Sequence, residues 1–126
     1  MLIQFLLLFI NLHVGFAGDI ADQLSKNFAE GNSRAISQSF AENVELTIVS
    51  LEDVYSKNQA EILLKDFFTK NPVQSFNITH KSIPKNNNYF LVGNLLAGKE
   101  KYKVYILLKQ ATDKTTIQQL RIELDK

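Results

Sequence analysis

The spacing of apolar residues predicts three helices in the part of the chain that follows residue 18. Ile20, Leu24 and Phe28 recur every four residues, which places them on one face of a helix. A short second helix is predicted over residues 33–40. A third begins near Ser56, a residue type that often caps a helix N-terminus.

Apolar and polar residues alternate over residues 44–51, and again along most of the chain after residue 72. This two-residue period is typical of half-buried strands. The later region divides into four long strands, at residues 73–83, 89–97, 101–111 and 115–124. Short turns between successive strands require antiparallel neighbours. We therefore predict an α+β fold in which three N-terminal helices pack on a curved antiparallel sheet.

The same alternation predicts which polar side chains share a face with apolar neighbours and point inward. They are His80, beside Phe76 and Ile78; Asn94, beside Phe90, Val92 and Leu96; and Gln118, beside Leu120, Ile122 and Leu124. A polar group on such a face needs a hydrogen-bond partner, which either the protein or a ligand can supply. Gln119, Arg121 and Glu123 fall on the opposite face of the last strand and fit either a solvated sheet or a dimer surface.

Residues 1–17 differ in character from the rest of the chain. They carry no charged side chain, and residues 2–10 are almost continuously apolar. Gly15 and Ala17 put small residues where a signal peptidase cuts, so we predict a secretory signal peptide over residues 1–17 and one domain over residues 18–126. A retained anchor is the alternative, but it needs about 20 apolar residues, and Asn11 and His13 interrupt this run.

Composition narrows the partners that we expect. The chain has 126 residues and a formal net charge of +1, so it fits one domain and gives no electrostatic reason to bind nucleic acid. It has no cysteine and two histidines, which leaves no ordinary zinc site and no thiol chemistry. We therefore predict no metal, no cofactor and, after processing, no stable membrane anchor. The mature protein is expected in the periplasm or secreted.

Several stretches resemble one known family. They are Phe40-Ala41-Glu42-Asn43-Val44-Glu45-Leu46, Val54-Tyr55-Ser56-Lys57-Asn58-Gln59-Ala60 and Ile117-Gln118-Gln119-Leu120-Arg121-Ile122-Glu123. With these stretches the chain resembles an uncharacterised exported bacterial family, domain-of-unknown-function family 4783, which has the cone-shaped fold of nuclear transport factor 2 (NTF2)-like proteins. The resemblance implies this fold and export. It brings no activity and no catalytic residues, and one fold can host both enzymes and binding modules.

Candidate chemistry therefore depends on individual residues. His80 is the only histidine of the predicted mature chain, and histidine serves as a general base near neutral pH. Asp53 is the second weak catalytic candidate. Tyr55, His80, Asn94 and Gln118 are the candidates for binding a ligand within the cone.

Three hypotheses for function remain open from the sequence. The first is a non-catalytic module that binds a small apolar ligand or a periplasmic protein, as a homodimer through the outer face of its sheet. The second is a small cone-fold hydrolase, isomerase or dehydratase with His80 as general base. The third is a protein with a solid core that acts only through its surface.

Overall fold

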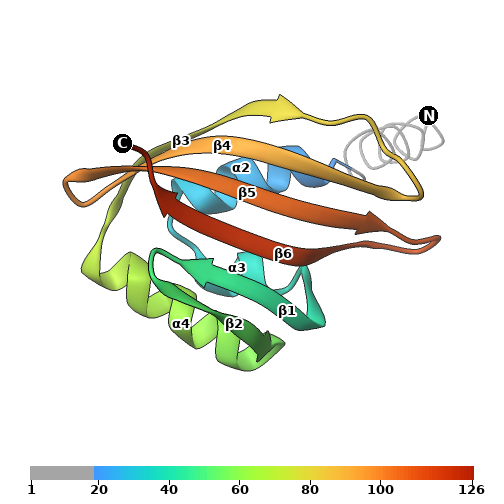
Figure 1. Cartoon of the computed structure of the whole chain (residues 1–126), viewed down its shortest axis with the longest axis horizontal. Helices are drawn as coiled ribbons and strands as arrows, with labels where there is room; N and C mark the ends of the chain where they lie inside the picture. The colour runs from blue at the N-terminus through green and yellow to red at the C-terminus, as the bar shows by residue number, and fades with distance from the viewer. Residues whose placement is uncertain (1–18) are drawn as a thin grey trace, which may run out of the picture.

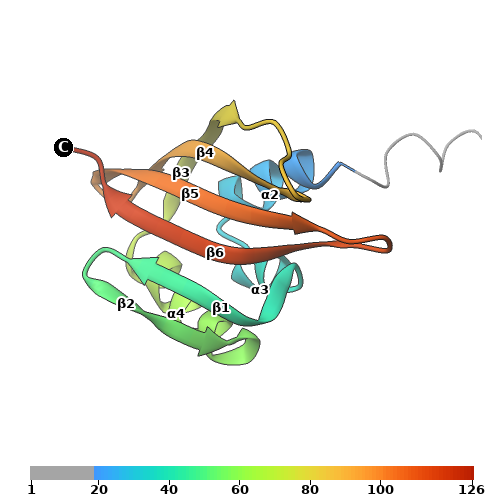
Figure 2. The same cartoon turned by 45° about the vertical axis from the view of Figure 1, so that its right-hand side comes forward.

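The computed structural model describes residues 19–126, so the predicted signal peptide lies outside the described residues. Strands form one six-stranded sheet in the order β2-β1-β6-β5-β4-β3. The elements are α2 (Ile20–Ala29), α3 (Ser33–Ser37), β1 (Phe40–Ile48), β2 (Leu51–Ser56), α4 (Lys57–Lys70), β3 (Val73–Lys81), β4 (Asn88–Ala97), β5 (Glu100–Gln110) and β6 (Thr115–Leu124). The helices of this region all lie on one side of the sheet (Figures 1 and 2). We call that side the inner face and the open side the outer face.

The predicted α+β fold with a curved sheet is confirmed, but two details of the prediction are wrong. The helices are not all N-terminal, because α4 follows β1 and β2 and packs on them, whereas α2 packs on β3. The sheet is also not wholly antiparallel, since β1 pairs with β6 in parallel. A parallel pair needs a long crossover, and here the whole chain between the two strands provides it.

Local capping explains where the helices begin. The Asp19 carboxylate accepts hydrogen bonds from the N–H groups of Ala21 and Asp22, at 3.1 and 3.3 Å. The Ser56 hydroxyl accepts from the N–H of Gln59 at 3.2 Å, which confirms the predicted start of α4. These bonds satisfy N–H groups that have no partner within the helix.

Aromatic rings from α2, α4 and β3 fill the inner face. Phe28 stacks on Phe76 with ring centroids 4.8 Å apart and meets Phe68 edge to face at 6.1 Å. Gly93 of β4 lets the Phe76 ring approach, because a Cβ built there would lie 2.6 Å from it. Among the described side chains, no buried nitrogen or oxygen lacks a hydrogen-bond partner. The inner face is therefore a packed core with its polar groups satisfied.

Two of the residues predicted to point inward, His80 and Gln118, do not do so, because the strand register shifts beside each of them. In β3 the pairing with β4 shifts between Ile78 and His80, so that His80 lies opposite Val92 on the outer face and is exposed. In β6 the shift opposite Leu107 and Leu108 leaves Gln118 out of the pairing, and Ile117 takes the buried position instead. A bulge adds one residue to one strand, and this reverses the faces beyond it.

The predicted inward placement of Asn94 is also wrong, for a different reason. Asn94 does share a face with Phe90 and Val92, but the residues that β4 buries on the inner face are the intervening ones, Leu91 and Leu95 among them. The face of β4 that was predicted to point inward is the outer face. Both faces of β4 are apolar, so alternation alone gave no means to tell which one the helices cover.

Candidate functional site

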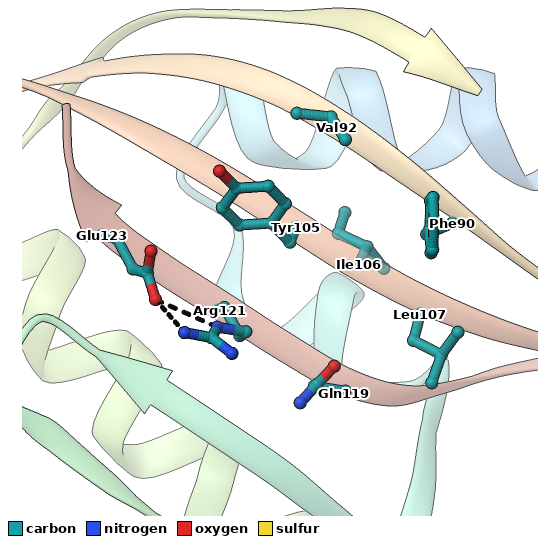
Figure 3. A pocket seen from close by; sticks show the side chains of 8 residues that line it. All are labelled: Phe90, Val92, Tyr105, Ile106, Leu107, Gln119, Arg121 and Glu123. Carbon is teal, nitrogen blue, oxygen red and sulfur yellow. Dashed lines mark hydrogen bonds and ion pairs between the residues drawn. The ribbon is translucent and has the colours of Figure 1, made fainter. Parts of the chain in front are cut away.

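The outer face of β4, β5 and β6 carries a shallow hollow with a volume of about 410 Å³. Figure 3 shows its lining residues on three adjacent strands; all of them except the buried Ile106 project on the side opposite the helices. It is lined by Phe90, Val92, Tyr105, Ile106, Leu107, Gln119, Arg121 and Glu123. Its floor is apolar and one wall is charged.

Two aromatic side chains of this hollow are unusually open to solvent. Phe90 is 48% exposed and Tyr105 is 39% exposed. They come from adjacent strands, because Phe90 pairs with Leu107 and Val92 pairs with Tyr105. Neighbouring strands lie about 4.8 Å apart, so these side chains form one continuous apolar patch. Contiguous exposed apolar surface of this kind marks an interaction site more often than a single exposed residue does.

Arg121 forms the charged wall of the hollow. Its Nε donates to the Glu123 carboxylate at 3.0 Å, and its Nη2 donates to the same oxygen. These bonds raise the pKa of Arg121 above its usual value, and the charges of Glu123, Glu52 and Tyr105 act in the same direction. The guanidinium stays charged, and its side chain is 40% exposed. It can therefore still meet an acidic or aromatic group from outside.

A more polar hollow of about 300 Å³ continues along the outer face beside Asn94. Lys103 holds this region together: its Nζ donates to Asn94 Oδ1 at 2.7 Å and lies 3.8 Å from an Asp125 carboxylate oxygen. Amide, ammonium and carboxylate groups thus border the apolar patch. An apolar centre with a polar rim is the usual anatomy of a protein interface.

The geometry of residues 19–126 bears on two further features, metal ligands and membrane-spanning helices. No three histidine, aspartate or glutamate side chains in that stretch come close enough to hold a metal ion. No helix there is long and apolar enough to cross a membrane.

Comparison with known families identifies the chain. The model for a domain of unknown function, DUF4783, matches residues 21–123. The chain belongs to the DUF4783 family. Crystal structures of DUF4783 family proteins from Bacteroides uniformis and Bacteroides fragilis are similar to it, with 25% and 27% identity and TM-scores of 0.79 and 0.77. The first comparison covers 86% of this chain and 99% of the other, and the second covers 85% and 100%.

The fold of this DUF4783 domain is NTF2-like. A designed protein of the NTF2 type is similar at a TM-score of 0.67 with 14% identity, covering 82% of this chain and 96% of the other. At that identity the likeness shows the fold alone. No curated protein matches the chain.

The DUF4783 domain keeps its two catalytic candidates apart. Asp53 lies on β2 and His80 on β3, and these are the two edge strands of the sheet. Five strand spacings separate them, or about 24 Å. The Asp53 carboxylate accepts a hydrogen bond from the N–H of Val54 at 2.8 Å, which is a local backbone contact. The fold therefore does not bring these two residues together.

The remaining candidates for ligand binding also lie in separate places. Tyr55, on β2, packs half-buried against the inner core. Gln118, at the bulge in β6, donates from Nε2 to the Thr116 hydroxyl at 2.8 Å. Asn94 binds Lys103 on the outer face. They line no common cavity in the described region, so a shared role in binding stays a prediction.

Sequence reasoning placed Gln119, Arg121 and Glu123 on this face of β6, but it missed the part of the hollow that β4 and β5 provide, although the sequence contains a signal for it. Residues 89–92 and 104–108 are continuous apolar runs within strands. Such runs are typical of strands that are apolar on both faces. These runs therefore indicate that the side of β4 and β5 opposite the helices is also suited to burial against another surface.

Proposed function

We propose that this protein is a non-catalytic assembly module that self-associates through the outer face of its sheet. The observation that carries the proposal is that β4 and the middle of β5 carry large apolar side chains on both faces, whereas the helices cover only one face. Burying exposed apolar area stabilises association by roughly 25 cal/mol per Å². Phe90 and Tyr105 offer the largest such groups of the hollow.

The size of the face supports a second copy of the chain as the occupant. A six-stranded sheet with strands about 4.8 Å apart and about 30 Å long presents on the order of 800 Å². A specific protein interface buries about the same area, roughly 800 Å², on each partner. The near-balanced charge of the chain, +1, also gives little net repulsion between two copies.

A small apolar ligand is the second candidate, and the hollow itself favours it. Its volume of about 410 Å³ lies in the range of small-molecule sites, roughly 300–1,000 Å³. The inner face is filled by Phe28, Phe68 and Phe76, so such a ligand would occupy the outer face and compete with self-association. We do not favour the cone-fold enzyme, because its two candidate proton-transfer groups, Asp53 and His80, lie on opposite edge strands of the sheet.

Export remains part of the proposal. A signal peptide cut after Ala17 would deliver the domain to the periplasm or outside the cell. Intact-mass measurement of protein recovered from the periplasm tests this directly. A chain that begins at Gly18 supports export, whereas an unprocessed chain in the cytoplasm contradicts it.

Self-association is tested by sedimentation of the mature domain over a range of concentrations, combined with native mass spectrometry. We expect a dimer, and we expect Phe90→Glu to make it monomeric while leaving its circular dichroism unchanged. Ile83→Glu is the matched control, because Ile83 is 88% exposed but does not line the hollow. A monomeric wild-type protein, or a dimer that Phe90→Glu leaves intact, would contradict the proposal. A monomer that retains a reproducible bound mass would favour the ligand.

A further inference from the structure

The strand β2 forms one edge of the sheet, and its edge is open to solvent (Figure 1). It pairs with β1 alone, and all its side chains except that of Tyr55 are exposed. An edge strand of this kind offers unpaired N–H and C=O groups to any chain that arrives in an extended conformation. The edge lies in the plane of the sheet, so it stays open when a second copy covers the outer face. β2 can therefore bind a partner independently of the self-association proposed above.

The register of the β1–β2 hairpin shows which main-chain groups of β2 point outward. Val54 lies directly opposite Glu45, and its N–H donates to the Asp53 carboxylate at 2.8 Å rather than to β1. Hydrogen-bonded and non-hydrogen-bonded pairs alternate along an antiparallel ladder. The main-chain groups of Glu52 therefore point the same way as those of Val54. These two residues supply the N–H and C=O groups that an added strand would bind.

The charge around this edge indicates which kind of chain fits it. β1 and β2 each carry two carboxylates and no basic side chain, although the whole chain has a net charge of +1. Glu52 and Asp53 lie on the edge strand itself. Opposite charges that face each other across two strands stabilise the pair, and like charges destabilise it. The edge therefore favours a basic strand and disfavours β2 of a second copy, which would bring its own carboxylates.

Nearby basic groups leave these carboxylates without an ion pair. Arg121 lies in the same row as Glu52, across β1, but Glu123 holds its guanidinium. Lys57 follows β2, but its Nζ donates to the Gln38 carbonyl at 3.3 Å. In the part of the chain that the structure describes, no carboxylate of β1 or β2 forms an ion pair. Their negative charge is therefore available to a partner.

The Asp53 carboxylate controls access to the edge. It occupies the N–H of Val54, where a carbonyl of an added strand would bind. A neutral or acidic strand that displaces this carboxylate leaves it with one hydrogen bond fewer and no new partner. A strand with lysine or arginine opposite Asp53 replaces the lost bond with a charge-assisted one. The side chain thus opposes most extended chains and admits basic ones.

We propose that the free edge of β2 binds a basic, extended segment of another protein, which adds one strand to the sheet. The main chain of this segment bonds to the outward N–H and C=O groups of Glu52 and Val54. A lysine or arginine of the segment pairs with Asp53, and an apolar residue lies beside the Val54 side chain, which is 57% exposed. In binding by strand addition, main-chain bonds supply affinity and the alternating side chains supply specificity.

The probe for this site is a short synthetic peptide that alternates lysine and valine and has both ends capped. Alternation allows a lysine opposite Asp53 together with a valine opposite Val54. We expect the peptide to bind and to slow hydrogen exchange of the Val54 amide roughly tenfold or more, because the amide then lies within a sheet. Two matched peptides are controls, one with glutamate in place of lysine and one with every backbone amide methylated. Neither should bind measurably.

Variants of the protein separate main-chain pairing from attraction between charges. Val54→Pro removes the outward donor and should abolish binding, since proline is tolerated on an edge strand where the N–H faces away from the sheet. Asp53→Asn keeps an acceptor oxygen but loses the charge, so the lysine peptide should bind roughly two- to fivefold more weakly. Glu100→Gln makes the same change on β5, three strands away, and should have no effect. Circular dichroism checks that every variant is folded.

The opposite results would each overturn the inference. If the lysine peptide does not bind, or if the glutamate peptide binds equally well, the proposed partner is wrong. If the methylated peptide binds as well as the lysine peptide, or if Val54 gains no protection, the attraction is one of charge and no strand is added. If Val54 becomes protected without peptide as the protein concentration rises, β2 pairs with a second copy instead. The methylated peptide keeps the test decisive even if Val54→Pro does not fold.

Discussion

The two faces of β4, β5 and β6 are built from the same strands, and both carry large apolar side chains, yet their surroundings differ. On the inner face, Leu91, Leu95 and Ile106 are each 1% exposed. On the outer face, Phe90 and Tyr105 are 48% and 39% exposed. The helices account for this difference, because they lie on the inner side only (Figures 1 and 2).

This contrast shows that the face on which a side chain lies and the burial of that face are separate properties. The alternation along a strand assigns each side chain to a face, but the elements packed against that face decide whether it is buried. A strand with two apolar faces has two faces to cover. In this chain the inner face stabilises the fold, and the outer face is available for association.

The largest expected effect comes from comparing a phenylalanine on each face. Phe28→Ala removes a fully buried ring that contacts both Phe68 and Phe76. We expect it to lower the free energy of unfolding by about 3–5 kcal/mol, since a cavity remains. Phe90→Ala should change the stability of the monomer by less than about 0.5 kcal/mol. Urea unfolding, followed at concentrations below the association midpoint, measures both.

Equal effects of the two substitutions would contradict this distinction between the two faces. If Phe90→Ala destabilised the isolated monomer as much as Phe28→Ala does, the outer face would be part of the folding core. If its effect appeared only at high protein concentration, the loss would belong to association, because a partner that binds only the folded state raises its apparent stability.

A second test concerns how tightly the inner face is packed. Gly93→Ala would place a Cβ 2.6 Å from the Phe76 ring and 2.9 Å from the Asn77 carbonyl oxygen. We expect a loss of about 1–3 kcal/mol, because an overpacked core must shift its backbone or its rings. Asn94→Ala is the matched control on the outer face. A neutral Gly93→Ala would show that Phe76 can move without cost.

The helices and strands of the described region follow from local patterns and could be predicted from the sequence. The periodicity of Ile20, Leu24 and Phe28 identified α2, and the buried face of β5 alternates as predicted. The residues after a bulge could not be placed. Nothing in the sequence around His80 or Gln118 marks the extra residue that shifts the register, because a bulge depends on how both strands fit the curved sheet.

The hollow on the outer face could not be predicted from the sequence for a related reason. The apolar runs of β4 and β5 are plain in the sequence, but a choice between two apolar faces needs the position of the helices. The parallel pairing of β1 with β6 was equally inaccessible, since it joins segments that are distant in the chain. Long-range pairing is set by tertiary packing rather than by local propensity.

A third test examines the turn that ends β1. Val49 has φ of 58°, a left-handed conformation that β-branched residues rarely adopt, and its N–H donates to the Ile122 carbonyl at 2.8 Å. This bond extends the pairing of β1 with β6 at the cost of local strain. We expect Val49→Gly to raise the free energy of unfolding by about 1 kcal/mol, since relief of strain exceeds the added entropy of the unfolded chain.

Ser50→Gly is the control for that turn, because Ser50 has no positive φ and gains nothing from glycine. It should lower stability slightly through the entropy of the unfolded chain alone. Thermal unfolding of both variants gives the comparison. A Val49→Gly protein that is less stable than wild type would mean that the exposed Val49 side chain contributes more than its backbone strain costs.

The smallest effect is expected at the open edge of the sheet, where β2 has a neighbour on one side only. Every second N–H of an edge strand points away from its neighbour and can pair with another chain. Here the Asp53 carboxylate accepts the N–H of Val54 at 2.8 Å, so the side chain occupies that donor. Asp53→Ala should speed hydrogen exchange of the Val54 amide by roughly two- to tenfold, as expected for the loss of one exposed hydrogen bond. Glu52→Ala, a carboxylate on the same strand without this bond, should leave it unchanged. If Asp53→Ala did not alter the exchange rate of Val54, that amide would be protected by the sheet itself, and the edge of β2 would need no side-chain cap.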